Sequence, residues 1–125
     1  MVVASRGVVT LDCAEPGPLA QFWADVLGGR VVHAGDAAVV VRTEWVAIAA
    51  MRVEGYVPPT WPAADVPKQV HLDLAVDDLE PAVAEAVRLG ATVAAHQPAP
   101  GLRRILLDPA GHPFCLTTQV PPAAL

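Results

Sequence analysis

The sequence predicts an α+β fold in which two similar βαβββ modules follow one another. Each half changes from a strand pattern to a helix pattern and back to three short strands. Both predicted helices end at a Leu-Gly pair, Leu27-Gly28 and Leu89-Gly90, and these pairs lie 62 residues apart. An internal duplication explains this spacing. Because neither four-stranded sheet with one helix can close a core alone, we expect a half-barrel whose concave face is a ligand pocket.

The first module begins with a strand over residues 8–13, which is rich in β-branched side chains. The segment Glu15-Pro-Gly-Pro18 is expected to break this strand, so the predicted helix begins at Leu19. Its apolar stripe has the i, i+3, i+4, i+7 spacing of one helical face and consists of Leu19, Phe22, Trp23, Val26 and Leu27. Strands are expected over residues 30–33, 37–42 and 44–53.

The second module repeats this order after a connector over residues 54–68, which has four prolines and two aromatic residues and is expected to be ordered. A strand over 69–76 leads into a helix from Leu79, capped by Asp77-Asp78. Strands follow over 92–96, 102–107 and 113–119, and Asp108-Pro-Ala-Gly111 predicts a turn closed by a left-handed glycine. We therefore expect one domain over residues 1–125. Its modules span about 6–53 and 69–119, followed by a loose tail over 120–125.

Composition and charge exclude several classes of function. The 13 acidic residues outnumber the 8 basic ones, and Arg103-Arg104 is the only adjacent basic pair, so a nucleic-acid partner is not expected. No apolar run is long enough to span a bilayer, and the first residues do not resemble a secretory signal. A cytoplasmic protein without a membrane partner is expected, with Cys13 and Cys115 as reduced thiols.

Strand alternation selects the candidate polar cluster. His71 and Asp73 share one face of their strand, and Thr10 and Asp12 share the corresponding face in the first module. Because the apolar residues between them should meet the helices, we expect these four side chains to face the concave pocket. There His71 and Asp73 could orient a ligand or relay a proton. Alternatively, they form a His–Asp pair that satisfies buried polar groups between the sheets.

Two tryptophans, a cysteine and an arginine complete the predicted ligand site. Trp45 lies on the expected strand 44–53, and Trp61 could cover the pocket mouth from the connector. The alternatives are core packing for Trp45 and pinning of the connector for Trp61. Cys115 could be a nucleophile, although a strand thiol is usually an inert part of the core. Either Arg103 or Arg104 should point inward and suit an anionic ligand, but alternation alone does not say which.

Three separated motifs and the connector resemble the glyoxalase-like branch of the vicinal oxygen chelate superfamily, which includes bleomycin-resistance-type proteins. The motifs are Leu19-Ala-Gln-Phe-Trp-Ala-Asp-Val-Leu-Gly28, His71-Leu-Asp-Leu-Ala-Val-Asp-Asp78 and Leu106-Leu-Asp-Pro-Ala-Gly-His-Pro-Phe-Cys-Leu116. The connector Tyr56-Val-Pro-Pro-Thr-Trp-Pro62 is similar to that of small actinobacterial members. The resemblance implies the duplicated fold, a homodimer and, in metal-using members, two ligands from each module.

The metal ligands of the superfamily are largely missing. His71 is the only residue that matches a family ligand, Cys115 stands where the last strand would offer Glu, and Val8 stands at the first position. Residues 45–51 offer no ligand. We therefore predict no cofactor and disfavour a divalent metal. The sequence favours a protein that binds or sequesters an aromatic, natural-product-like small molecule. The alternative is a glyoxalase-like lyase or isomerase that uses His71 with Asp73, or a non-standard metal held by His71 and Cys115.

Overall fold

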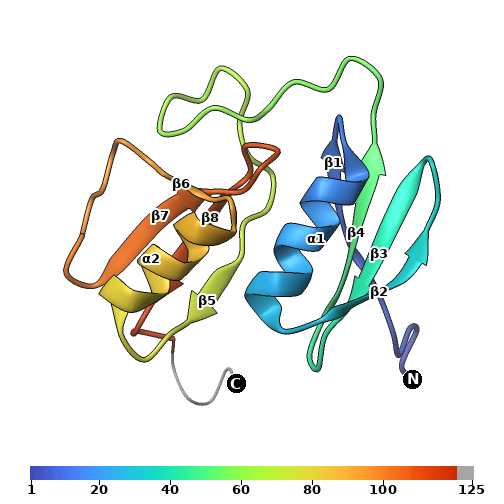
Figure 1. The fold of residues 1–125 in the computed structure, drawn as a ribbon, viewed down its shortest axis with the longest axis horizontal. Helices are drawn as coiled ribbons and strands as arrows, with labels where there is room; N and C mark the ends of the chain where they lie inside the picture. Colours follow the sequence, from blue (N-terminus) through green and yellow to red (C-terminus); the bar gives the residue numbers. More distant parts are fainter. Residues whose placement is uncertain (121–125) are drawn as a thin grey trace. The chain divides into compact units, whose positions relative to one another are not determined.

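A computed structural model describes residues 1–120 of the chain (Figure 1). Of the loose tail expected over residues 120–125, residues 121–125 lie outside the described residues. Two compact units are present, one spanning Met1–Val57 and the other beginning at Pro58. Each unit contains one helix and one four-stranded sheet, which confirms the predicted α+β fold of two βαβββ modules. None of the helices within residues 1–120 is both long and apolar enough to cross a membrane.

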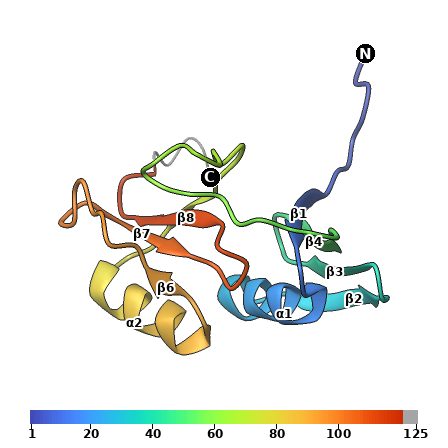
Figure 2. The same ribbon diagram turned by 90° about the horizontal axis from the view of Figure 1, so that it is seen from above.

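The first unit has the strand order β1-β4-β3-β2. β1 (Val9–Cys13) runs parallel to β4 (Ala47–Arg52), whereas β3 (Ala38–Arg42) is antiparallel to both β4 and β2 (Arg30–Ala34). Between β1 and β2 the chain forms α1 (Pro16–Leu27), which lies along one face of this sheet (Figure 2). The crossover helix allows the first and last strands of the unit to pair in parallel.

α1 begins three residues earlier than the sequence predicted. Pro16 occupies the first helical turn, where its missing N–H would have no partner within the helix and its fixed φ already suits helical geometry. The prolines expected to delay the helix therefore begin it. The predicted end is confirmed, because Gly28 has a left-handed φ of 68° and its N–H donates to the carbonyl of Ala24.

The apolar stripe of α1 supplies the core of the first unit. Leu19, Phe22 and Trp23 are each at most 2% exposed, and Phe22 and Trp23 meet edge to face. Across from the helix, the sheet contributes the fully buried Val41 and Ile48. Burying large apolar side chains is worth roughly 1.5–3 kcal/mol each, so this layer of the helix against the sheet stabilises the first unit.

The second unit has the equivalent strand order β5-β8-β7-β6. β5 (Asp73–Ala75) runs parallel to β8 (Pro113–Thr117), and β7 (Arg103–Leu107) is antiparallel to β8 and to β6 (Thr92–Val93). α2 (Leu79–Leu89) connects β5 to β6 and packs on one face of this sheet (Figure 2). The two units therefore share one topology, as an internal duplication predicts.

Several strands are shorter than the sequence predicted, and beyond the end of β6 a side chain takes the place of a strand partner. β6 ends at Val93 instead of residue 96. Beyond it, the Gln97 side chain donates to the carbonyls of Ala94 and Ile105 and accepts from the Ile105 amide. β5 likewise spans only residues 73–75 of the expected 69–76, so His71 lies just before the strand.

The turn between β7 and β8 forms as predicted. Gly111 has a positive φ of 89° and donates its N–H to the carbonyl of Asp108. The buried Asp108 carboxylate accepts from the amides of Ala110 and His112, each at 2.9 Å. This closed turn sets the start of β8 and thereby the position of Cys115.

Candidate functional site

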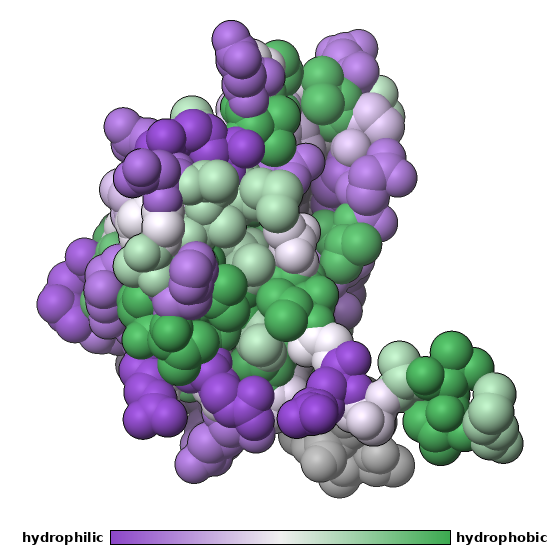
Figure 3. Space-filling model, turned by 90° about the vertical axis from the view of Figure 1, so that its right-hand side faces the viewer, coloured by the Kyte–Doolittle hydropathy of each residue, from purple (hydrophilic) through white to green (hydrophobic). Residues whose placement is uncertain are grey.

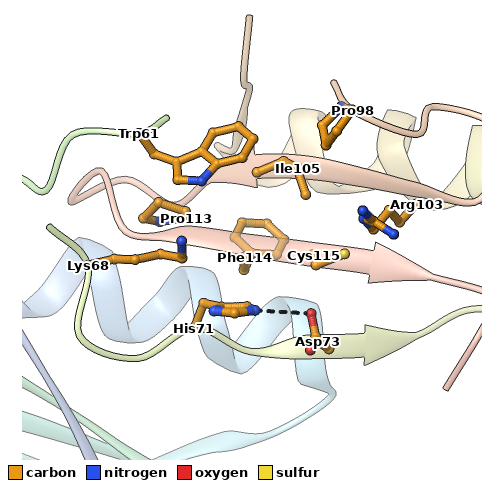
Figure 4. Close-up of a pocket in the computed structure, with 10 residues that line it drawn as sticks. All are labelled: Trp61, Lys68, His71, Asp73, Pro98, Arg103, Ile105, Pro113, Phe114 and Cys115. Carbon is orange, nitrogen blue, oxygen red and sulfur yellow. Dashed lines mark ion pairs between the residues drawn. The ribbon is translucent and has the colours of Figure 1, made fainter. Parts of the chain in front are cut away.

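The second unit contains a pocket of about 150 Å³ on the face of its sheet that is opposite α2 (Figure 4). The sheet and the loops on either side of it line this pocket. Every lining residue belongs to the second unit; they are Trp61, Lys68, His71, Asp73, Pro98, Arg103, Ile105, Pro113, Phe114 and Cys115.

The register of the sheet places the site residues on one face. Asp73 pairs with Cys115, and Cys115 pairs with Ile105 on the next strand. Side chains of directly paired residues point to the same side of a sheet, so these three side chains form a row across β5, β8 and β7. His71 lies two residues before Asp73 and joins the same face, whereas Leu74 is buried on the other. The predicted alternation is correct here.

His71 and Asp73 form an open pair at the edge of the pocket. The His71 Nε2 and Asp73 Oδ1 atoms are 3.4 Å apart, and the two side chains are 44% and 56% exposed. Within the second unit the pair is therefore accessible, and the alternative of a His–Asp pair that satisfies polar groups between the sheets stays a prediction. The pair meets solvent and the pocket together, where it could orient a ligand or exchange a proton with it.

Cys115 forms part of the apolar floor. Its side chain is buried at 4% exposure, and it clusters with Ala94 and Ile105. Burial, followed by the charge and the hydrogen bonding of Asp73, raises the pKa of Cys115 to about 11, and Arg103 offsets only part of this rise. Because the thiolate is the nucleophilic form of cysteine, a thiol that stays protonated at neutral pH argues against a nucleophilic role.

Trp61 forms the wall above this floor (Figure 4). Its ring packs against the cluster that includes Ile105 and Cys115, lies 5.4 Å from the His96 ring and has the Lys68 Nζ at 5.8 Å from its centroid. The preceding residue holds the connector in place, because the Thr60 amide and hydroxyl bond to nearby backbone groups. The aromatic surface is therefore positioned before any ligand arrives.

The structure decides which arginine faces the pocket. Arg104 lies on the α2 side of β7, where its guanidinium bonds to Glu80 of α2 and to the carbonyl of Pro100. Arg103 points the other way and lines the pocket. No ion pair holds Arg103 within residues 1–120, so its charge is available to a ligand.

The candidates from the first unit have different surroundings. Thr10 and Asp12 are exposed, and the intervening Leu11 and the buried Cys13 take the opposite face of β1. That these two side chains share a pocket with His71 and Asp73 stays a prediction. Trp45 does not lie on a strand as expected: β4 begins at Ala47, so Trp45 is in a bend and is 63% exposed.

Five lining residues were not among the sequence candidates. Ile105, Pro113 and Phe114 lie on β7 and β8, and the other two are Lys68 and Pro98. Both lie in irregular segments, where periodicity gives no orientation. A separate sequence signal relates the two modules. The motif Val-x-Leu-Asp-x-Ala occurs over residues 9–14 and again over 70–75. The motif makes Asp12 the equivalent of Asp73. Met51 is then the equivalent of Cys115, because Met51 pairs directly with Asp12 on β1 and Cys115 pairs directly with Asp73 on β5.

The residues in this pocket do not fit the metal site that the superfamily resemblance implied. Residues 1–120 contain no group of three His, Cys, Asp or Glu side chains that could hold a metal ion. His71 and Asp73 offer donors, but Cys115 is buried in the apolar floor with Ala94 and Ile105, and catalytic zinc sites use about three protein ligands.

The matching strand orders of the two units, together with the pocket on the sheet of the second unit, define the chain as a duplicated βαβββ protein. The glyoxalase-like domain family matches residues 8–117, and the chain belongs to this family. No curated protein matches the chain.

Several solved structures share the fold at low identity. Fosfomycin resistance protein FosX from Mesorhizobium loti has a TM-score of 0.67 and 18% identity, covering 95% of this chain and 94% of its own. A glyoxalase-related enzyme from Fulvimarina pelagi has a TM-score of 0.65 and 19% identity, covering 92% and 88%. A variant of FosX from Listeria monocytogenes, solved with Mn(II) and 1S,2S-dihydroxypropylphosphonic acid, has a TM-score of 0.69 and 12% identity, covering 95% and 93%. At these identities, the similarity establishes the fold alone.

Proposed function

We propose that this protein binds a small molecule that has an aromatic ring and an acidic group, and that it holds this ligand in the pocket of the second unit. The observation that carries the proposal is an apolar floor and an aromatic wall bordered by a guanidinium that forms no ion pair with any residue from 1 to 120. Ile105 and Cys115 form the floor, Trp61 the wall, and Arg103 the charged edge. Such pockets combine apolar contact with a few polar groups that fix orientation.

The size of the pocket limits what it can enclose. An engineered apolar cavity of about 150 Å³ binds benzene, and the pocket here has the same volume. One aromatic ring can therefore lie beside Trp61, on the floor that Ile105 and Cys115 form, and the rest of the ligand extends beyond the part that this unit encloses. Ligand pockets for whole drug-sized molecules are typically about 300–1,000 Å³. We infer that the pocket is the ring subsite of a larger ligand.

Charge at the pocket favours an anionic substituent. Lys68 and Arg103 contribute two positive charges, against one negative charge from Asp73, which also contacts His71. A guanidinium recognises carboxylate and phosphonate groups through paired hydrogen bonds. The Listeria FosX variant, which is similar in fold, was solved with a phosphonic acid, and this makes an arylphosphonate a sensible first probe.

Binding of phenylphosphonate tests the proposal. We expect saturable binding by calorimetry together with a shift of the Trp61 indole N–H resonance, because the ring would lie against this side chain. Arg103→Gln should weaken binding about tenfold, since bonds to charged groups are worth about 1.5–3 kcal/mol. Arg88→Gln is the matched control, because Arg88 is an exposed arginine of α2 that pairs with Glu85. Equal affinity of the two variants would reject the assignment of the pocket.

A second candidate function, a glyoxalase-like lyase or isomerase, is supported by the His71–Asp73 pair. The imidazole faces the carboxylate at 3.4 Å beside the proposed ring position, which is an arrangement suited to general acid–base catalysis. This candidate predicts turnover of a bound α-hydroxy or carbonyl compound that His71→Gln abolishes while affinity is preserved. Binding without turnover, with and without added divalent metal, would leave the binding protein as the function.

A further inference from the structure

We propose that the first unit carries a separate site for a small oxyanion attached to an aromatic ring, such as an aryl phosphate. The site lies where β3 ends and β2 begins. Arg30 and Arg42 would hold the anion, Arg6 would add positive charge, and Trp45 would contact the ring. All four residues belong to the first unit, so this proposal does not depend on the function proposed for the second.

The first observation is a cross-strand pair of like charges. Arg30 on β2 is directly opposite Arg42 on β3, and both side chains are exposed. Like charges directly opposite each other on neighbouring strands are destabilising. In the part of the chain that the structure describes, neither guanidinium has an ion pair, although the protein has 13 acidic residues and a net charge of −5. An anion between the two guanidinium groups would remove this repulsion.

The backbone fixes this pair in position. A Cβ atom on Gly29 would lie 2.6 Å from the Arg42 carbonyl oxygen and 2.8 Å from the Thr43 Cγ2 atom. Only glycine therefore allows the chain to leave α1 and pass this close to the end of β3. Because Arg30 follows Gly29 directly, the close approach sets the two arginines side by side instead of leaving their spacing to flexible loops.

A pocket opens beside the pair. It measures about 450 Å³ and lies between the segment that precedes β1 and the bend that joins β3 to β4. Arg6 and Arg42 both line it, and Glu44 is its one acidic lining residue. With Arg30 adjacent to Arg42, the region carries three positive charges against one negative charge. A concave region with excess positive charge attracts anions.

The same pocket presents an aromatic side chain that is held in place but not buried. Trp45 is 63% exposed and lines the pocket. The bend that carries it is fixed by the buried Thr43, whose hydroxyl donates to the Val46 carbonyl at 2.8 Å and accepts from the amides of Trp45 and Val46. Thr43 therefore fixes the backbone that carries Trp45 but leaves the indole ring uncovered. An uncovered indole can stack on a ligand ring.

The surroundings of the site favour a small ligand that has both an anionic group and an aromatic ring. Figure 3 shows the side of the first unit where β2 forms the sheet edge, with apolar side chains gathered toward its middle and polar side chains mostly around them. Arginine pairs bind phosphate through parallel hydrogen bonds, and a neighbouring indole adds contact for a planar group. An aryl phosphate combines the two features, whereas inorganic phosphate would use the arginines alone.

The test uses the full chain labelled with ¹⁵N and titrated with phenyl phosphate at constant ionic strength. The three indole N–H resonances separate the sites, because Trp23 is buried at 1% exposure, Trp45 reports the first unit and Trp61 the second. We expect a saturable shift of Trp45. Arg42→Gln and Arg30→Gln should each weaken the affinity read at Trp45 at least tenfold.

Arg52→Gln is the matched control. Arg52 is an exposed arginine at the end of β4, whereas Arg42 pairs with Ala47 at the start of this strand. We expect Arg52→Gln to change the affinity for phenyl phosphate less than twofold. Trp45→Ala, read at the Val46 amide, should weaken phenyl phosphate more than inorganic phosphate. Equal weakening by Arg52→Gln, or a response at Trp61 alone, would overturn the proposal. A response at Trp61 that Arg103→Gln removes would support the second-unit site independently.

Discussion

Alkaline pH is expected to destabilise the protein through Cys115. Burial beside Asp73 raises the pKa of this thiol from about 9 to about 11 in the folded protein. Each tenfold change in proton affinity is worth about 1.4 kcal/mol, so the difference corresponds to about 2–3 kcal/mol. Since the folded pKa lies above the unfolded one, the full stabilisation is present below pH 9 and is lost as the pH rises through 11.

Urea unfolding of the wild type and of Cys115→Ser between pH 8 and pH 11.5 measures this effect. The hydroxyl of serine does not ionise in this range, so the variant lacks the loss that the thiol causes. At pH 8 the variant should be less stable, because a hydroxyl in this apolar floor costs about 1–3 kcal/mol. Between pH 8 and pH 11.5 the difference in free energy of unfolding between the wild type and Cys115→Ser should narrow by about 2–3 kcal/mol, because only the wild type loses the stabilisation by the protonated thiol.

Comparing the two pH profiles also cancels the titration of lysine and tyrosine, which the two proteins share. Parallel profiles over the whole range would refute the reasoning. So would rapid alkylation of Cys115 by iodoacetamide at pH 7.5 in the folded protein, because only an accessible thiolate reacts quickly. In either case, Cys115 would return as a candidate nucleophile.

Three further substitutions test the structural basis of the two sites. Gly29→Ala should lower the free energy of unfolding by about 1–3 kcal/mol in urea titrations, because the new methyl would contact the Arg42 carbonyl; Gly17→Ala, at an open position, is its control. Thr43→Val should cost about 1–3 kcal/mol, since it removes the hydroxyl that closes the bend, and Thr43→Ser should recover most of this. Trp61→Ala should cost about 2–3 kcal/mol and abolish phenylphosphonate binding, whereas Trp61→Phe should retain part of both. Unchanged unfolding midpoints for these variants would contradict the packing described.

Strand and helix periodicity predicted most of the fold. The duplicated order of elements, the Leu-Gly helix ends and the Asp108–Gly111 turn all depend on local chemistry, and the structure confirms each of them. The errors lie at boundaries. The start of α1 at Pro16 and the start of β4 at Ala47 were misplaced, because first-turn prolines and a threonine-closed bend override simple breaker and strand patterns.

For the candidate site, alternation correctly placed His71 and Asp73 on one face and Leu74 on the other. It could not choose between Arg103 and Arg104. That choice depends on which face of β7 meets α2, where Glu80 binds Arg104. It also missed Lys68, because an irregular connector has no period from which an orientation can be deduced.

The sequence by itself determined the fold class, the repeat and the set of residues able to act on a ligand, because these follow from local periodicity and side-chain chemistry. Only the tertiary structure decided which of these side chains meet. Strand register sets Asp73 beside Cys115 and Arg30 opposite Arg42, and the folded connector places Trp61 over Ile105. These contacts join residues far apart in the chain, and their geometry depends on how whole elements pack.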